Sequence, residues 1–298
     1  MTLLLGYYAL FASALSVNKL ILFSLSTWLF VAIRRLAAGI ILFSYITITS
    51  KSERLKLRYI QKDLLTILYI SILTMFVPSI LKAYSFQNLV SSKAALLGSL
   101  DPFVTAFYAY LLWKEKLTLQ QIVGMVVAFA GVIVLMTSTN PLEMAAGEWG
   151  IISLPELAMI GSLIISRYGW ILAREMLKTE RYSSSELNSL IMIVSGLYAL
   201  VATYLLGICD FCTIPLTSTF AALFAYSVFF GEIAGYTVYG NLLKNYNITL
   251  LSLAGLTIPL FVHLLGPLIL GEPLSSVFFV ALGLVACGMY IFYRDQIQ

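Results

Sequence analysis

Two carboxylates interrupt long apolar stretches of the sequence. Asp101 lies within SLDPFVTAFYAYLLWKEK, and Glu232 lies within FFGEIAGYTVYG. A charged side chain in such a setting is costly to bury unless it has a partner or faces a water-filled cavity. Two roles therefore fit each carboxylate. In the functional role, the carboxylate binds a substrate amine or carries a coupling proton. In the structural role, it forms an ion pair with Arg34, Arg35 or Lys82.

Basic side chains in the same apolar stretches outnumber these two carboxylates. Arg34 and Arg35 are the deepest, about eight or nine residues from the outer end of their stretch. Because neighbouring helix residues point about 100° apart, we expect at most one of them to face a cavity squarely. Arginine pairs with carboxylate or phosphate through parallel hydrogen bonds, so the excess of cations predicts an anionic or zwitterionic substrate. The other basic candidates for the site are Lys19, Lys82 and Arg167, of which the lysines are also near enough to helix ends to reach the interface, as is Lys93.

A histidine and two tyrosines complete the candidate site. His263 is the only histidine of the chain. Two roles fit its side chain. Either it relays a proton or contacts the substrate, or it is a structural residue whose ring N–H donates to a backbone carbonyl. Tyr236 and Tyr239 follow Glu232 by four and seven residues on one helix face, and we expect them to line the cavity.

Pro102 and Pro259 are the predicted helix breaks. Proline removes a backbone donor and clashes with the preceding turn, so each should loosen its helix near the middle of the membrane. The carbonyls freed in this way need partners or a water-lined cavity. A kink that serves only packing is the alternative.

The elements that carry these residues are predicted to be membrane-spanning helices. Of the 298 residues, 60% are hydrophobic and 11% are charged, and the mean hydropathy is +0.95. Soluble domains contain about 25% charged residues, so lipid must cover much of this protein. Ten apolar runs have about the 20-residue length that spans a bilayer, which predicts an all-α integral membrane protein. The runs are roughly 2–22, 26–48, 63–86, 92–113, 119–137, 151–173, 186–207, 217–240, 249–270 and 275–293.

The distribution of Lys and Arg orients these helices. Five basic residues lie in the connection after the second run, between Lys51 and Lys62, and further basic residues recur on the same side. The opposite connections contain Lys93 and mostly acidic residues. Because cytoplasmic loops are enriched in Lys and Arg, we expect both termini to be cytoplasmic in a multi-pass protein of the cell (inner) membrane. The net charge of +4 follows from this bias, so it does not indicate a nucleic-acid partner.

Matching residues recur 157 positions apart. The informative pairs are Asn88 and Asn245, Gly98 and Gly255, Pro102 and Pro259, Glu115 and Glu272, and Gly131 and Gly288. Such a repeat divides the chain into residues 1–139 and 150–298, each with five helices. Because five is odd, the second copy must be inverted. Inverted repeats are typical of secondary transporters, with the substrate site near the middle of the membrane.

The stretch NLVSSKAALLGSLDPFVTAFYAYLLWKEKLTLQQIVGMVVAFAGVIVL resembles an EamA repeat of the drug/metabolite transporter superfamily. That family typically has a proline in the fourth helix, then a Gly-Glu or similar pair before a glycine-containing fifth helix. Here Pro102 and Glu115 fit this pattern, and Pro259 and Glu272 fit it again. The resemblance covers nearly the whole chain. It implies a ten-helix transporter that moves a small organic molecule by alternating access, and it does not fix the substrate. We separately expect a proton or ion as coupling partner, and neither a cofactor nor a metal.

Other classes of membrane protein fit the sequence less well. An intramembrane enzyme is the first alternative, but no H-E-x-x-H motif or P-loop is present. IVSG (193–196) also lacks the first glycine of a G-x-S-G serine motif. A channel or a non-transporting scaffold is the second alternative. The paired prolines and buried charges favour a site that is alternately exposed to the two sides.

Local motifs predict how individual helices begin and pack. Thr118-x-x-Gln121 is a capping-box pattern, and Glu115 and Glu272 are expected to support helix ends. Two stretches of small residues favour close helix packing, either inside the chain or in a homodimer. These stretches are Gly124-x-x-x-Ala128 with Gly131, and Gly283-x-x-x-Cys287 with Gly288.

Overall fold

The protein is helical throughout almost all of its described length. The computed structural model describes residues 2–49, 57–114, 117–136, 147–149, 152–208, 214–215, 217–234 and 254–297. Within these ranges, seven helices are long and apolar enough to cross a membrane, and two apolar helices are shorter. The strands of the described residues are β1 (Glu148–Trp149) and β2 (Ile152–Ser153), which pair antiparallel.

The chain forms two compact units, and each unit draws on both halves of the sequence. Unit 1 comprises Met1–Leu20, Tyr84–Ile160 and Ala234–Gln298, whereas unit 2 comprises Ile21–Ala83 and Gly161–Ile233. Each unit therefore contains segments that are far apart along the chain.

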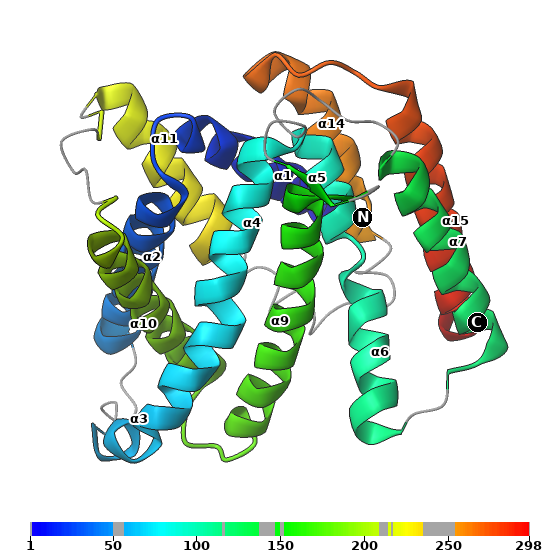
Figure 1. The fold of residues 1–298 in the computed structure, drawn as a ribbon. Coiled ribbons are helices and arrows are strands. Elements are labelled where there is room, and N and C mark those ends of the chain that lie inside the picture. The colour runs from blue at the N-terminus through cyan, green and yellow to red at the C-terminus, as the bar shows by residue number, and fades with distance from the viewer. Residues whose placement is uncertain are drawn as a thin grey trace. The chain divides into compact units, whose positions relative to one another are not determined.

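Unit 1 is organised around a pair of closely packed helices. α7 (Leu119–Met136) runs beside α15 (Ser276–Ile297), as Figure 1 shows in green and red. A Cβ atom added at Gly288 would lie 2.5 Å from the carbonyl oxygen of Gly124, so only glycine permits this approach. The Gly124 face thus packs on Gly288 inside the chain, one of the two arrangements that the sequence left open. Gly283 and Cys287 of the second predicted stretch are exposed and do not take part in this contact.

The start of α7 confirms the predicted capping box. The Thr118 amide donates to the Gln121 side-chain oxygen at 2.9 Å, and the Gln121 amide donates to the Thr118 hydroxyl at 3.2 Å. These reciprocal bonds satisfy donors that the first helical turn leaves without intrahelical partners. The remaining helices with residues in unit 1 are α1 (Thr2–Leu22), α4 (Val77–Asn88), α5 (Ser91–Gly98), α6 (Asp101–Trp113), α9 (Leu154–Leu177) and α14 (Thr257–Leu270).

Unit 2 has a second helix pair, α2 (Thr27–Thr49) and α10 (Ser184–Leu205). Glycine again sets the distance, because a Cβ atom at Gly39 would lie 2.8 Å from the Ile193 amide nitrogen, and one at Gly196 would lie 2.8 Å from that of Leu36. Buried aliphatic residues of both helices form one core cluster with residues of α3 and α9. The other elements of unit 2 are α3 (Leu57–Ser71), the π-helical turn η1 (Ile72–Phe76), α11 (Ser218–Val228) and the π-helical turn η3 (Phe229–Ile233).

The starts of several elements recur at one offset along the chain. η1 begins at Ile72 and η3 begins at Phe229, which is 157 residues later. The same offset separates the first residues of α2 and α10, and those of α7 and α15. Each of the two closely packed pairs therefore joins helices at equivalent positions of the two sequence halves.

The apolar run around Asp101 forms two helices rather than one. α5 ends at Gly98 and α6 begins at Asp101, with a turn between them. Pro102 lies in the first turn of α6, where its missing amide donor breaks no intrahelical bond. Pro259 likewise lies in the first turn of α14, whereas Pro267 lies inside that helix.

Candidate functional site

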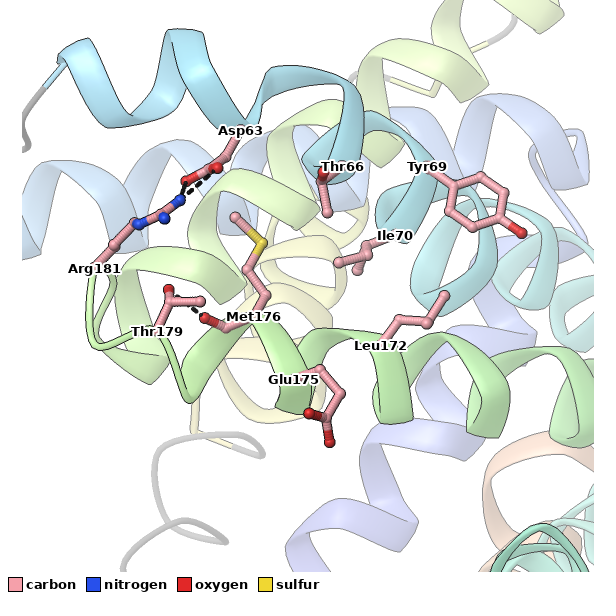
Figure 2. A pocket seen from close by; sticks show the side chains of 9 residues that line it. All are labelled: Asp63, Thr66, Tyr69, Ile70, Leu172, Glu175, Met176, Thr179 and Arg181. Carbon is pink, nitrogen blue, oxygen red and sulfur yellow. Dashed lines mark hydrogen bonds and ion pairs between the residues drawn. The ribbon is translucent and has the colours of Figure 1, made fainter. Parts of the chain in front are cut away.

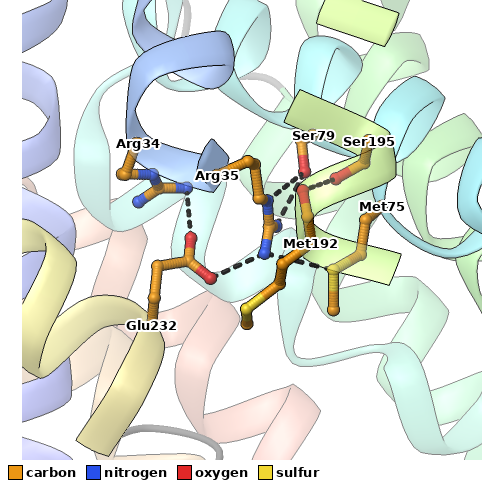
Figure 3. A network of polar contacts seen from close by, with 7 residues as sticks. All are labelled: Arg34, Arg35, Met75, Ser79, Met192, Ser195 and Glu232. Atoms are coloured by element: carbon orange, nitrogen blue, oxygen red, sulfur yellow. Dashed lines mark hydrogen bonds and ion pairs between the residues drawn. The ribbon is translucent and has the colours of Figure 1, made fainter. Parts of the chain in front are cut away.

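Two arginines of α2 hold one buried carboxylate in unit 2, as Figure 3 shows. The Glu232 carboxylate lies 2.8 Å from a terminal nitrogen of Arg34 and 2.6 Å from one of Arg35, with a different oxygen in each contact. Arg35 also donates to the Ser79 hydroxyl through Nε at 3.2 Å and Nη2 at 2.7 Å, and its Nη1 lies 3.4 Å from the Met75 sulfur. We call Arg34, Arg35 and Glu232 the arginine–glutamate cluster.

Both neighbouring arginines reach this carboxylate because their side chains are long enough to converge. The Arg34 guanidinium lies over the Phe30 ring, with its central carbon 4.7 Å from the ring centre. From this position one of its terminal nitrogens contacts Glu232. Arg35 is only 7% exposed and Glu232 only 2%. The structure therefore gives Glu232 the ion-pair partners that were one of its two predicted roles.

The carboxylate and the Met75 sulfur come from the two π-helical turns of unit 2. Glu232 is the fourth residue of η3, and Met75 is the fourth residue of η1. Gly169 of α9 packs closely on η1, because a Cβ atom there would lie 2.6 Å from the Thr74 amide nitrogen. Single π-helical turns occur frequently at functional sites. Sequence inspection missed Met75 and Ser79, although the 157-residue offset from Glu232 leads to Met75.

Further cations of unit 2 add to the positive charge near this cluster. Lys82 is exposed, and the charges of Arg34, Arg35, Arg167 and Glu232 all act on its ammonium group. These five side chains comprise four cations and one carboxylate, so together they have a net charge of +3. These side chains therefore add positive charge to the surroundings of the cluster.

Unit 1 contains two ion pairs between distant parts of the sequence. Lys19 lies 2.6 Å from the Glu272 carboxylate and also donates to the Leu89 carbonyl. Glu272 in turn accepts from the backbone amide and the hydroxyl of Ser91, which begins α5. It therefore stabilises the start of a helix, although that helix lies far from it in the sequence.

The second pair in unit 1 joins Lys93 to Glu156 at 2.8 Å. Lys19 and Lys93 are each only 3% exposed. The expectation that they extend to the membrane interface is therefore wrong, because each has a carboxylate partner that removes the need to reach water. Lys82, in contrast, is exposed.

The other predicted site residues occupy separate positions. Asp101 is half-buried in the first turn of α6. The His263 ring is buried and stacks on Phe278, with ring centres 4.0 Å apart. Tyr236 and Tyr239 lie outside the described residues.

A pocket of about 300 Å³ lies between α3 and α9 in unit 2, as Figure 2 shows. Its lining is largely apolar, with Ile70 and Met176 among its side chains, and an ion pair lies at its edge. There Arg181 binds both carboxylate oxygens of Asp63, at 2.7 and 2.9 Å, and this contact raises the pKa of the Arg181 guanidinium. Burial and the same carboxylate raise the pKa of Tyr182 to about 12. No motif in the sequence predicts the contact between Asp63 and Arg181.

Comparison with protein families gives a match over both halves of the chain. The family described as the EamA-like transporter family matches residues 1–137 and 153–294. One solved crystal structure aligns over 100% of this chain and 98% of its own, with a TM-score of 0.65. At 14% sequence identity, that likeness shows the fold alone.

Several relatives are similar over most of their length. The S-adenosylmethionine/S-adenosylhomocysteine transporter of Chlamydia trachomatis serovar L2 is 26% identical over 267 residues, which cover 89% of this chain and 80% of the relative. The transporter of that name from Chlamydia muridarum is 27% identical, with 89% and 82% covered. The uncharacterized inner membrane transporter YedA of Escherichia coli K12 is 25% identical, with 97% and 91% covered.

Proposed function

We propose that this chain, which belongs to the EamA-like transporter family, carries S-adenosylmethionine or S-adenosylhomocysteine across the membrane. Family membership makes it a multi-pass membrane transporter of a small molecule, and not an enzyme. The narrower substrate class is our inference from the arginine–glutamate cluster and from the relatives that bear these substrates in their names.

The observation that carries this proposal is the pair of guanidinium groups around one carboxylate. Arg34 and Arg35 approach the two oxygens of Glu232 from α2, an arrangement that also suits the carboxylate of an amino acid. Both adenosyl compounds end in such a group, with a carboxylate and an ammonium on one carbon. S-Adenosylhomocysteine is therefore zwitterionic, in agreement with the substrate charge that the sequence predicts.

We further propose the architecture that alternating access requires. It consists of ten spanning helices in two inverted repeats, 1–139 and 150–298, with both termini in the cytoplasm of the cell (inner) membrane. The 157-residue offset between η1 and η3 supports the repeat, and the two closely packed helix pairs support it further. In inverted-repeat transporters one set of helices moves against the other around a fixed substrate site.

Uptake of labelled S-adenosylhomocysteine into proteoliposomes tests the substrate class. Arg34→Ala and Arg35→Ala should each reduce binding about 10- to 150-fold, because a hydrogen bond to a charged group contributes about 1.5–3 kcal/mol. Lys178→Ala is the control, since Lys178 is exposed and pairs only with the exposed Glu175 among the contacts of described residues. Saturable uptake that both arginine variants retain in full would contradict the assigned site, and absence of uptake by the unaltered protein would contradict the substrate.

A further inference from the structure

We infer that Glu232 is a built-in competitor that occupies, in the substrate-free protein, the place of the substrate carboxylate. This inference rests on the proposed function, because it assigns the substrate carboxylate to Arg34 and Arg35. Glu232 presents one oxygen to each arginine, at 2.8 and 2.6 Å. A substrate carboxylate that binds the same two guanidinium groups must displace it.

The rest of Arg35 is already fixed without Glu232. Its Nε and Nη2 donate to the Ser79 hydroxyl, so the guanidinium keeps its orientation when the carboxylate leaves. Arg34 is held over the Phe30 ring in a similar way. The two arginines thus form a receptor for carboxylates whose geometry does not depend on Glu232.

The helix that carries Glu232 is built so that this residue can move. η3 (Phe229–Ile233) is a single π-helical turn that follows α11 directly. A π-helical turn holds about one residue more than an α-helical turn. Conversion to α-helix therefore rotates the residues on one side by about 100°. A small part of this rotation is enough to move the Glu232 carboxylate off the two guanidinium groups, and it leaves the carboxylate within reach of a group bound to them without unfolding the helix.

When a substrate carboxylate displaces Glu232 from the arginines, the Glu232 carboxylate itself needs a new partner. In a site sheltered from water, an unpaired carboxylate is costly. An amino acid supplies both replacements, because its carboxylate binds the arginines while its ammonium group binds Glu232. A compound with only one of these groups leaves either Glu232 or the arginines without a partner, so the cluster selects zwitterionic ends.

Binding of three adenosine thioethers to the purified protein tests this exchange. The probes are S-adenosylhomocysteine, its analogue without the amino group, and its analogue without the carboxyl group. The unaltered protein should bind the first at least 10-fold more tightly than either analogue. Glu232→Gln should bind the analogue without the amino group at least 10-fold more tightly than the unaltered protein does, since the competitor is gone. Equal affinity of the two proteins for that analogue would overturn the inference.

A second experiment uses sodium formate as the probe and needs no adenosyl compound. Glu232→Ala leaves space between the arginines, so formate should raise the melting temperature of this variant more than sodium chloride of equal ionic strength does. The unaltered protein should show no such difference. If Glu232→Ala can be purified in folded form only when formate is present, that result supports the inference equally. If Glu232→Ala and Glu232→Gln show no benefit from formate, or fail to fold even in its presence, Glu232 is a structural partner alone. Failure of all adenosyl probes, with formate effective, rejects the substrate but not the exchange.

Discussion

Replacement of Gly288 by alanine should disrupt the close contact between α7 and α15 in unit 1. The new Cβ atom would lie 2.5 Å from the Gly124 carbonyl oxygen and 2.6 Å from the Ala128 amide nitrogen. Both atoms belong to the backbone of α7, so no side chain can rotate to make room. The helices must separate by about 1 Å to restore ordinary contact, and overpacking of this kind costs about 1–3 kcal/mol.

Gly283 provides the matched control in the same helix. It is exposed, and no atom lies within 4 Å of an added Cβ. Both substitutions gain the same helix propensity, about 1 kcal/mol in favour of alanine, so that gain cancels when the two variants are compared. The difference between their unfolding free energies then isolates the packing cost of about 1–3 kcal/mol.

Equilibrium unfolding of the purified protein in detergent, with SDS as denaturant, measures this difference. Gly288→Ala should unfold at lower SDS than Gly283→Ala, and the unfolding constants should differ by about 5- to 150-fold. Two variants of equal stability would show that α7 and α15 do not approach each other as closely as the glycines indicate.

Two further predictions concern transport and orientation. Asp101→Asn keeps the size of the side chain in the first turn of α6 but removes its charge, so the protein should fold and lose S-adenosylhomocysteine uptake, or lose its dependence on a pH gradient. Normal uptake with an unchanged pH profile would assign Asp101 a structural role. Single cysteines at Lys56 and Glu143, on a background without native cysteines, should react in intact cells with an impermeant reagent at position 143 alone, and the reverse pattern would contradict cytoplasmic termini.

Features that depend on neighbouring residues could be predicted from the sequence. Composition and run length predicted a helical membrane protein, and seven helices of the described residues are long and apolar enough to span a bilayer. The Thr118–Gln121 spacing predicted a capping box that the structure confirms. The small residues around Gly124 and Gly288 predicted close packing. The cap follows a local rule, because its bonds join Thr118 and Gln121 within one helical turn. Small residues mark a helix face that can pack closely, but they do not indicate which helix that face meets.

Partners across the sequence could not be predicted in the same way. Lys19 and Glu272 are 253 residues apart, and nothing near either residue indicates the other. The sequence therefore predicts Lys19 in the substrate site or at the interface, whereas the structure gives it a carboxylate partner. The convergence of Arg34 and Arg35 on Glu232 depends on side-chain length and on the π-helical turn, and neither is visible in the helical spacing of the residues.

The close packing of α2 with α10 has a consequence for the biosynthesis of this protein. The Gly39 face of α2 meets its partner only after 157 further residues have been synthesised, because α2 begins at Thr27 and α10 at Ser184. Ribosomes add about 5–20 residues per second, so the nascent α2 stays in the membrane without that partner for roughly 8–30 s. A chain truncated in this interval lacks at least one helix of each pair, and we expect the quality-control proteases of the membrane to degrade it.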